Sequence, residues 1–413
     1  MANDYICALD IGTTKICAHI AEIDENDMLK IIGVGTAPSD GLRRGVVINL
    51  EKTIQAIIKA REEAERMAGV EIEAVYAGIA GDHIRSVNGR GVVAVAGENH
   101  IISQEDKKRV IDAAKAVALP FDREIIHILP QEFIVDDQRS ITDPIGMSGV
   151  RLEAEVHIVT CAVTAAQNIW RSIEGAGMSV MDLVLEPLAS SFAVLTPDEK
   201  DLGVCVLDLG GGTTDIAMFY EGCIRHTAIV SLGGRNVTND IAHGLRTPIE
   251  SAEAIKVNFG SAIAKEDDRE RLVEVPGVGG RPPRKVAKSL LVDIIQPRME
   301  EILSLAHNEI KKSDYVHLMT AGAVLTGGGA MLPGTIELAE AIFEMPVKLG
   351  TPGGIKSVSD DVNMPLHATG VGLILYGKEN SEIIDGPLSS SESHVFEKII
   401  ERMKRWFGGG RGV

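Results

Sequence analysis

Short apolar runs separated by Gly/Thr turns open the chain. YICALDIG, KICAHIAEID and LKIIGVGT follow one another within residues 5–36, and a Gly/Thr turn joins the first two. Runs of this length, rich in β-branched residues and bounded by turn residues, predict strands. A helical period then covers about residues 51–67. The first part of the chain therefore predicts three strands followed by a helix.

The same order of elements returns near residue 202. GVCVLDLGGG, TTDIAMFYEG and CIRHTAIVSLGG repeat the pattern of strand, acidic residue, glycine turn and two further strands, and a helical stretch follows at about 236–245. Self-similarity of this kind indicates a duplicated architectural unit. We therefore predict two related α/β lobes that face each other.

Two segments exceed what the duplicated unit needs. Residues 83–161 contain three predicted strands, RSVNGRGVVAV, REIIHILPQEFIV and RLEAEVHIVTC, and a helix, SQEDKKRVIDAAKAV, for which Ser103 is a plausible N-cap. This predicts an α+β subdomain. Residues 226–312 form a second insertion, with two helical stretches around the loop VPGVGGRPPR. By contrast, residues 37–50 are too few to hold a subdomain after the third strand.

The C-terminal part changes character after the apolar helix HATGVGLILYG. Residues 377–394 are polar and Ser-rich, as in a flexible tether, and a helical period resumes at 395–407. The apolar face of that helix carries Val395, Phe396, Ile399, Ile400, Met403, Trp406 and Phe407, and the opposite side carries Lys398, Arg402, Lys404 and Arg405. An amphipathic basic helix of this kind predicts binding to the surface of an anionic membrane. Docking on its own domain, or on a partner protein, is the alternative.

Composition narrows the classes of function. The 413 residues include 41 Lys and Arg against 59 Asp and Glu, a net charge of -18, which argues against a body that coats nucleic acid nonspecifically. The five cysteines lack CxxC spacing and are expected to be reduced core residues. The N-terminus has no signal-peptide pattern, and no window approaches the roughly 18 apolar residues of a membrane span. We expect a cytosolic protein. The histidines show no metal-binding spacing.

Three glycine-rich elements carry the candidate chemistry. Asp10-Ile-Gly12-Thr13-Thr14-Lys15 and Asp208-Leu-Gly210-Gly211-Gly212-Thr213-Thr214-Asp215 each place a carboxylate at a strand end before a glycine and hydroxyl turn. Turn glycines let backbone N–H groups converge on a phosphate, and the carboxylates can hold hydrated Mg²⁺. One such turn alone is more often a plain hairpin. The third element, with Gly327, Gly328, Gly329 and Met331, stands between a strand and a helix, where a nucleotide can approach the backbone closely.

These three elements, in this order, resemble the phosphate 1, phosphate 2 and adenosine motifs of the actin, Hsp70 and sugar-kinase superfamily. The resemblance extends to LEPLAS, where Glu186 would orient the attacking water, and to Gly233-Gly234 with Glu253 and Lys256, which would surround adenine and ribose. Glu253 and Lys256 can equally form an ordinary surface ion pair on a helix. Lys15 would meet a β- or γ-phosphate, or be an exposed strand lysine.

Over essentially the whole chain, the sequence resembles FtsA, the family of bacterial cell-division actin homologues. The resemblance rests on the placement of the insertions, the GGRPPR loop, the sequence Gln296-Pro297-Arg298 and the tethered tail helix. The implied fold is an actin-like α/β fold with two ribonuclease-H-like halves. The corresponding division is lobe 1 core 1A (1–82 and 162–198), inserted subdomain 1C (83–161), lobe 2 core 2A (199–225 and 313–363), subdomain 2B (226–312), a helix returning to 1A (364–376), a linker (377–394) and the amphipathic helix (395–407).

The resemblance implies a function in cell division at the cytoplasmic face of the inner membrane. An FtsA-like protein would bind ATP and Mg²⁺, form actin-like filaments with itself, and tether filaments of the tubulin-like protein FtsZ to the membrane. Arg284, Lys285, Lys288, Arg298 and Glu301 in 2B would bind the acidic C-terminal peptide of FtsZ, although each could simply lie on a solvated helix face. Subdomain 1C would contact neighbouring subunits and other division proteins. Asp10, Asp208, Asp215 and Glu186 would support slow ATP turnover, with Asp10 and Asp208 holding Mg²⁺ through water.

Other members of the superfamily provide the competing hypotheses. A small-molecule kinase shares the nucleotide motifs but needs a substrate motif, and none is evident between the lobes. A chaperone needs a long peptide-binding domain after the nucleotide lobes. An actin-like pilus-assembly protein has a similar layout but lacks a tail helix, so residues 395–407 discriminate between it and an FtsA-like protein.

Overall fold

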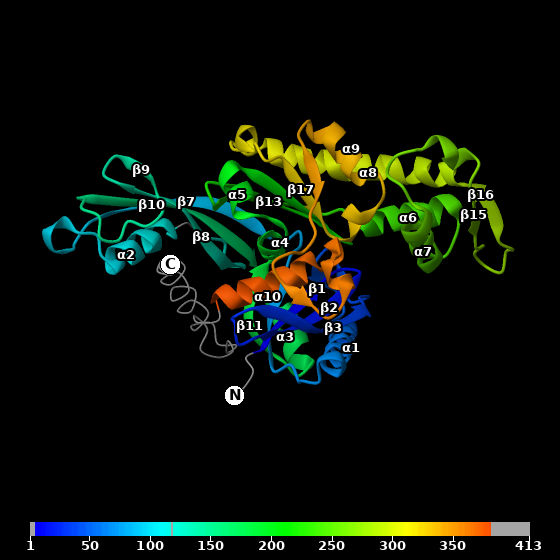
Figure 1. Ribbon diagram of the computed structural model, residues 1–413, viewed down its shortest axis with the longest axis horizontal. Helices are drawn as coiled ribbons and strands as arrows, with labels where there is room; N and C mark the ends of the chain where they lie inside the picture. The colour runs from blue at the N-terminus through cyan, green and yellow to red at the C-terminus, as the bar shows by residue number, and fades with distance from the viewer. Residues whose placement is uncertain (1–4, 117–118, 381–413) are drawn as a thin grey trace.

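The computed structural model describes residues 5–116 and 119–380. A central body of two stacked lobes carries two arms that extend in opposite directions (Figure 1). One arm consists of α2 (Gln104–Ala114) and the four strands β7 to β10, and the other contains α6 (Gly234–Leu245), α7 (Ile249–Phe259) and a short hairpin. The body holds the two related α/β units that the repeated pattern predicted.

Lobe 1 is built on a six-stranded sheet. Its strands, in spatial order, are β11 (Ser179–Leu185), β6 (Ala74–Ile79), β1 (Tyr5–Ile11), β2 (Lys15–Ile23), β3 (Leu29–Pro38) and β19 (Lys356–Ser357). β1, β2 and β3 are antiparallel neighbours, as their short turns require, whereas β6 and β11 run parallel after crossovers. The predicted strand triplet is therefore present and supplies the centre of the sheet.

Helix α1 (Leu50–Ala68) shows how the sequence fixes the packing of this sheet. The Asn49 side chain caps the first turn, and Gly69, with φ of 73°, ends the helix in the left-handed conformation. A Cβ on Gly35 of β3 would lie 1.9 Å from Ala60 O, so only glycine lets the helix sit this close to the strand. Lobe 1 also contains α3 (Val163–Gly175), α4 (Glu186–Val194), α10 (Ala368–Asn380) and the two-stranded β4 (Leu42–Arg43) and β5 (Val46–Val47).

Lobe 2 repeats the plan with five strands. Their order is β14 (Cys223–Val230), β13 (Thr214–Tyr220), β12 (Val204–Leu209), β17 (Ala323–Thr326) and β18 (Val347–Leu349), accompanied by α5 (Pro197–Leu202), α8 (Lys288–Lys311) and α9 (Thr335–Phe343). β14 remains in this sheet until Val230, and so runs across the 225/226 boundary expected for 2B. Short η helices connect the elements: η3 (Val316–Leu318), η4 (Gly328–Met331), η5 (Asp360–Asn363) and η6 (Pro365–His367).

The arm of lobe 2 contains a hairpin that the sequence pattern did not predict. VPGVGGRPPR connects β15 (Leu272–Val275) and β16 (Arg284–Ala287), whereas we expected only helices on either side of it. Each of these strands has four residues, too few for the alternation of apolar and polar positions to stand out. The η2 turn (Glu266–Arg269) precedes them.

The arm of lobe 1 is the predicted α+β subdomain. Its sheet has the order β7 (Arg85–Ala94), β10 (Arg151–Ala162), β8 (Arg123–Val135) and β9 (Gln138–Ile141), with α2 on one face and η1 (Glu98–His100) before it. Ser103 is the N-cap of α2 in a reciprocal capping box with Asp106, which confirms that prediction. The subdomain has an apolar core of its own, built around residues such as Phe133 and Leu152.

This arm also contacts lobe 2 along the edge strand β14. A register shift in β8 leaves Gln131 opposite no residue of β10, and its buried amide donates to the carbonyl oxygens of Ile224 and Arg225 at 2.9 and 3.1 Å. The His157 ring bonds Thr227 Oγ1 at 2.9 Å, and Ser86 Oγ donates to Thr227 O. We call this contact the 1C seam.

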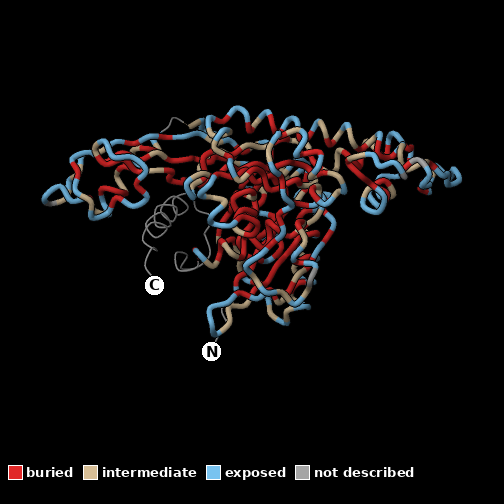
Figure 2. The backbone as a smooth tube through the Cα atoms, turned by 45° about the horizontal axis from the view of Figure 1, so that its top comes forward, coloured by how far each residue is buried: buried red, intermediate tan, exposed pale blue. Residues whose placement is uncertain are grey.

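Burial is concentrated in the two lobes and thins out along the arms (Figure 2). Cys7, Cys17, Cys161 and Cys205 are buried and Cys223 is partly buried, and all five are free thiols, as expected. Within the described residues, no helix is both long and apolar enough to span a bilayer. Helix α10 continues to Asn380, so the first four residues of the linker predicted at 377–394 are helical instead. The rest of that linker and the amphipathic helix predicted at 395–407 lie outside the described residues.

Candidate functional site

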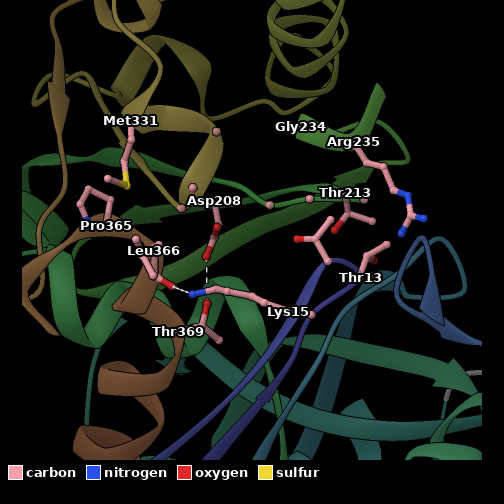
Figure 3. A pocket seen from close by; sticks show the side chains of 18 of the residues that line it. Thr13, Lys15, Asp208, Thr213, Gly234, Arg235, Met331, Pro365, Leu366 and Thr369 are labelled. Carbon is pink, nitrogen blue, oxygen red and sulfur yellow. Dashed lines mark hydrogen bonds between the residues drawn. The ribbon is translucent and has the colours of Figure 1, made fainter. Parts of the chain in front are cut away.

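A cavity of about 390 Å³ lies between the two lobes, lined by all three glycine-rich elements. A volume of this size is typical of a small-molecule site. Figure 3 shows Thr13 and Lys15 reaching it from lobe 1, Asp208 and Thr213 from lobe 2, and Met331 at one end. Elements about 200 and 320 residues apart in the chain thus converge on one cavity, as the resemblance implied.

The two Asp-Gly hairpins meet face to face at the floor of the cavity. A Cβ on Gly211 would lie 2.4 Å from Thr14 Oγ1, and one on Gly212 would lie 2.4 Å from Thr13 Oγ1. Thr13 Oγ1 also accepts the backbone N–H of Gly45 at 3.1 Å. The glycines are required because the turns approach each other more closely than side chains would permit, which leaves backbone N–H groups and hydroxyls to surround an anion.

The third element closes the cavity beside Asp208. Gly327 follows β17 with φ of 82°, and a Cβ there would lie 2.3 Å from Asp208 Oδ1. The chain then forms η4, whose Met331 side chain faces the cavity (Figure 3). A positive φ combined with this close approach explains why glycine stands at this position.

Four carboxyl groups gather around the floor: those of Asp10, Asp208 and Asp215 are buried, and that of Glu186 is half-buried. Burial raises the pKa of Asp10 to about 6 and that of Asp215 to about 8, with a further rise from Asp208 in each case. Burial likewise raises the pKa of Asp208, and burial together with the three aspartates raises that of Glu186 well above its usual value. Buried acidic groups this close together disfavour one another's charge, so the site favours a cation that would offset it.

Hydrogen bonds satisfy only part of this acidic cluster. Asp208 accepts the hydroxyls of Ser190 at 2.7 Å and Thr369 at 3.0 Å, and Asp215 accepts that of Thr213 at 2.8 Å. Asp215 Oδ1 is buried and has no hydrogen-bond partner among the residues that the structure describes. An orphaned buried carboxylate oxygen beside three other carboxyl groups fits a divalent cation with its water shell.

The described residues hold no group of three or more carboxylate, His or Cys side chains arranged to ligate a metal ion directly. Mg²⁺ commonly keeps several waters and uses one or two carboxylates together with substrate phosphates. The carboxyl cluster therefore suits a hydrated ion that arrives with a nucleotide better than a resident metal. Asp10 and Asp208 line the cavity and are the residues that would hold such an ion through water.

Two of the three cations at the cavity already have partners. The Lys15 ammonium donates to Leu366 O at 2.6 Å, which joins the first hairpin to the segment before α10 (Figure 3). Lys256 pairs with Glu253 at 2.8 Å and donates to Thr238 Oγ1 at 3.0 Å. The ion pair expected as an alternative therefore forms, and it forms at the cavity wall, because both Glu253 and Lys256 line it.

Most of the predicted nucleotide residues line the cavity. They are Asp10, Gly12, Thr13, Thr14, Lys15, Glu186, Asp208, Gly210, Gly211, Gly212, Thr213, Gly234, Glu253, Lys256, Gly327, Gly328, Gly329 and Met331. Thr214, Asp215 and Gly233 stand behind this wall: Thr214 bonds Leu232 O, and Gly233 packs against the carbonyl of Gly210.

Several lining residues were not predicted from the sequence. They include Gly45, Ala80, Arg235, Val237, Val257, Met299, Leu332, Pro333, Pro365, Leu366 and Thr369. Most belong to segments that approach only through the fold and carry no local motif. The exceptions directly follow residues that the sequence did single out: Arg235 follows the Gly233-Gly234 turn, Val257 follows Lys256, and Leu332 and Pro333 follow Met331.

The basic residues predicted to bind an acidic peptide lie on the arm of lobe 2, away from the cavity. Lys288 pairs with the buried Asp268 at 2.9 Å, and Arg298 pairs with Asp240 and also with Glu301. Arg284 donates to Leu245 O at 2.9 Å, and Lys285 is exposed on β16. Of these predicted residues, Lys285 and part of Arg284 therefore present the charge that is most available to a partner.

The tail residues predicted to bind membrane, from Val395 to Phe407, lie outside the described residues.

Comparisons with known proteins agree with this geometry. A family model described as cell division protein FtsA matches residues 205–372, and one described as an SHS2 domain inserted in FtsA matches residues 81–160. The chain is 47% identical to the cell division protein FtsA of Pseudomonas aeruginosa over 99% of this chain and 98% of that protein. It is 39% identical to the Escherichia coli K12 protein of the same description, over 97% of each.

Solved structures support the fold independently. A type IV pilus biogenesis PilM–PilN complex matches with a TM-score of 0.66 at 16% identity, covering 90% of this chain and 98% of that one. MreB5 of Spiroplasma citri bound to ADP matches with a TM-score of 0.56 at 14% identity, covering 92% and 99%. At these identities the likeness concerns the fold alone, and it confirms the expected actin-like architecture with an inserted α+β subdomain.

Proposed function

Because the chain belongs to the FtsA family of cell division proteins, we propose that it binds Mg-ATP between its lobes and tethers FtsZ filaments to the inner membrane during division. The observation that carries this proposal is the cavity where the two Asp-Gly hairpins meet in front of a buried carboxyl cluster. Such a site can hold a phosphate chain and its cation, and it spans both lobes. Nucleotide binding would therefore bias the relative position of the lobes.

Different residues of the cavity would bind different parts of the nucleotide. The hairpin N–H groups and Thr13, Thr14 and Thr213 would hold the phosphates, and Met331 with the Glu253–Lys256 pair would flank the adenosine. Mg²⁺, when bound, would neutralise phosphate charge beside Asp10 and Asp208. Glu186 is half-buried and lines the cavity, where its carboxyl group would orient a water toward the terminal phosphate. Because such positioning sets the rate, we propose slow turnover and a nucleotide that acts mainly as an assembly switch.

The arm of lobe 2 is the proposed site for the acidic FtsZ peptide. Arg284 and Lys285 occupy β16, and their charge contrasts with a chain of net charge -18. Ion pairs within the chain already engage Lys288, Arg298 and Glu301. We therefore propose that these three residues stabilise the conformation of this surface. Self-assembly and contacts with other division proteins are proposed to use the opposite arm, subdomain 1C.

Membrane attachment is proposed for the amphipathic helix at 395–407, joined by the 377–394 linker. One such helix binds a bilayer weakly, so stable attachment would require many assembled copies. The pilus-assembly alternative is not favoured. Its fold matches, but the identities of 39–47% over nearly the full chain are to cell division proteins.

Co-sedimentation with anionic liposomes in the presence of Mg-ATP tests the tether. We expect the full chain to pellet with lipid and to carry an FtsZ C-terminal peptide with it, whereas a chain that ends at Ser393 loses lipid binding and retains the peptide. Replacing Lys285 by Glu should weaken binding of the peptide and leave binding of lipid unchanged. Lys30→Glu, at an exposed position of β3, is the matched control and should leave both unchanged. Absence of lipid binding by the full chain would exclude the membrane role.

A further inference from the structure

Among the three cations that line the cavity, Arg235 differs because its side chain is not engaged. Lys15 and Lys256 bond a carbonyl and a carboxylate, respectively. The Arg235 guanidinium makes no hydrogen bond or ion pair with the described residues, although it is half-buried at the cavity wall. A guanidinium has five N–H donors in a fixed fork suited to phosphate oxygens. Its donors are thus available to a bound anion.

The backbone fixes where this side chain begins. The N–H groups of Gly234 and Arg235 donate to the carbonyl oxygens of Gly210 and Gly211 at 2.9 and 2.8 Å, so the start of α6 is bound to the second phosphate hairpin. Arg235 therefore keeps its place relative to Gly211 and Gly212, whatever the rest of the arm does. Its position is set by the same hairpin that would hold the phosphates.

Figure 3 shows the direction of the side chain. Arg235 extends past Thr213 toward Thr13, and lies on the opposite side of these two threonines from Met331. Met331 belongs to the adenosine element, and the threonines to the two phosphate hairpins. In this view Arg235 therefore lies beyond the hairpins from Met331, while the residue before it, Gly234, also contacts Lys256 through its carbonyl oxygen at 3.3 Å.

We propose that Arg235 is a specificity-determining residue that contacts the terminal phosphate of a nucleoside triphosphate and makes the cavity prefer the triphosphate over the diphosphate. The inference rests on the proposed function, since it presumes that a nucleotide occupies the cavity. A diphosphate that sits in the same pose lacks the outermost group, so the guanidinium would have nothing to bond. Arg235 reaches from lobe 2 toward Thr13 of lobe 1, so the contact would also make lobe closure depend on the terminal phosphate.

The test compares dissociation constants of Mg-ATP, Mg-AMPPNP and Mg-ADP for the full-length chain by isothermal titration calorimetry. For Arg235→Gln we expect binding of both triphosphates to weaken by about 10- to 100-fold, the loss of a charge-assisted hydrogen bond, with Mg-ADP binding changed less than about threefold. Arg235→Lys should restore part of the loss, because it keeps the charge without the fork. Arg246→Gln, at the other end of α6 and outside the cavity, is the matched control.

Three results would overturn the proposal, and each differs from the others. Unchanged affinity of Arg235→Gln for both triphosphates would exclude the contact. Equal weakening of triphosphate and diphosphate would assign Arg235 to shaping the cavity instead. If the unmodified chain binds none of the three nucleotides, the proposed function itself fails, and this inference with it. Thermal unfolding without nucleotide, expected to match between Arg235→Gln and the control, shows that both variants are folded.

Discussion

Two of the contacts between lobe 1 material and lobe 2 are built in opposite ways. At the 1C seam, the buried Gln131 amide donates to the carbonyl oxygens of Ile224 and Arg225. The buried His157 ring bonds the side chains of Asn88 and Thr227. At the cavity between the lobes, carboxyl groups stand close together, and Asp215 Oδ1, behind the cavity wall, has no partner among the described residues. Gln131 and His157 are thus paired within the chain, although the buried Nε2 of His226 on β14 has no partner among the described residues. The cavity instead leaves part of an acidic cluster unpaired.

This difference separates a contact that stabilises the fold from one that awaits a ligand. Buried polar groups cost free energy unless they are paired, and a cluster of buried carboxyl groups costs most, so a bound cation would stabilise the cavity more than the seam. The seam should therefore respond to mutation through stability and the cavity through affinity. Three substitutions test that division.

The largest effect is expected at the cavity. In Gly212→Val, a branched side chain would overlap Thr13, whose Oγ1 lies 2.4 Å from the Cβ position, and would force the hairpins apart. We expect Mg-ATP affinity to fall by at least about 100-fold, or about 2.7 kcal/mol, as measured by calorimetry. Gly353→Val is the control, because the atom nearest to its Cβ position is 3.9 Å away. Binding that survives Gly212→Val within a few-fold would mean that the nucleotide does not lie between the hairpins.

A stability effect is expected at the seam. Gln131→Leu removes the donor for two buried carbonyl oxygens of β14, which should lower the free energy of unfolding by about 2–4 kcal/mol. Urea denaturation measures it, and Mg-ATP affinity should change less than about threefold. Gln138→Leu, at an exposed position of β9, serves as the control. A loss of affinity without a loss of stability in Gln131→Leu would break the division between the two contacts.

The smallest effect concerns pH. Burial lowers the pKa of His157 to about 3 in the folded state, whereas the pKa in the unfolded chain is about 6.5. Between these values the ring is neutral in the folded chain and protonated in the unfolded chain. The contribution of His157 to the free energy of unfolding is therefore fully present above pH 6.5. It is lost as the pH falls toward 3, by about 1.4 kcal/mol per pH unit.

Replacing His157 by Gln, which cannot titrate, should make the urea midpoint less sensitive to pH between 6.5 and 5. Arg151→Gln, at the exposed start of the same strand, should keep the sensitivity of the unmodified chain. Identical pH profiles for His157→Gln and the unmodified chain would show that the ring is charged or solvated at the seam.

The sequence predicted whatever is encoded locally. The strand triplets, the Ser103 cap and the glycine turns depend on neighbouring residues, and all are present. The hairpin of β15 and β16 was missed because four-residue strands give too little periodicity. Gln131 was missed because only a register shift in β8 turns it toward β14, and Arg235 because one arginine after a glycine pair forms no pattern. The roles of Gln131 and Arg235 both depend on which distant segments the fold brings next to them.

Calorimetric titration of Mg-ATP into the full-length chain tests the central claim most directly. The account predicts saturable binding at one site per chain, displaced by Mg-ADP and abolished in Gly212→Val but not in Gly353→Val. No binding at millimolar Mg-ATP, or equal binding by both valine variants, would contradict a nucleotide site between the two hairpins.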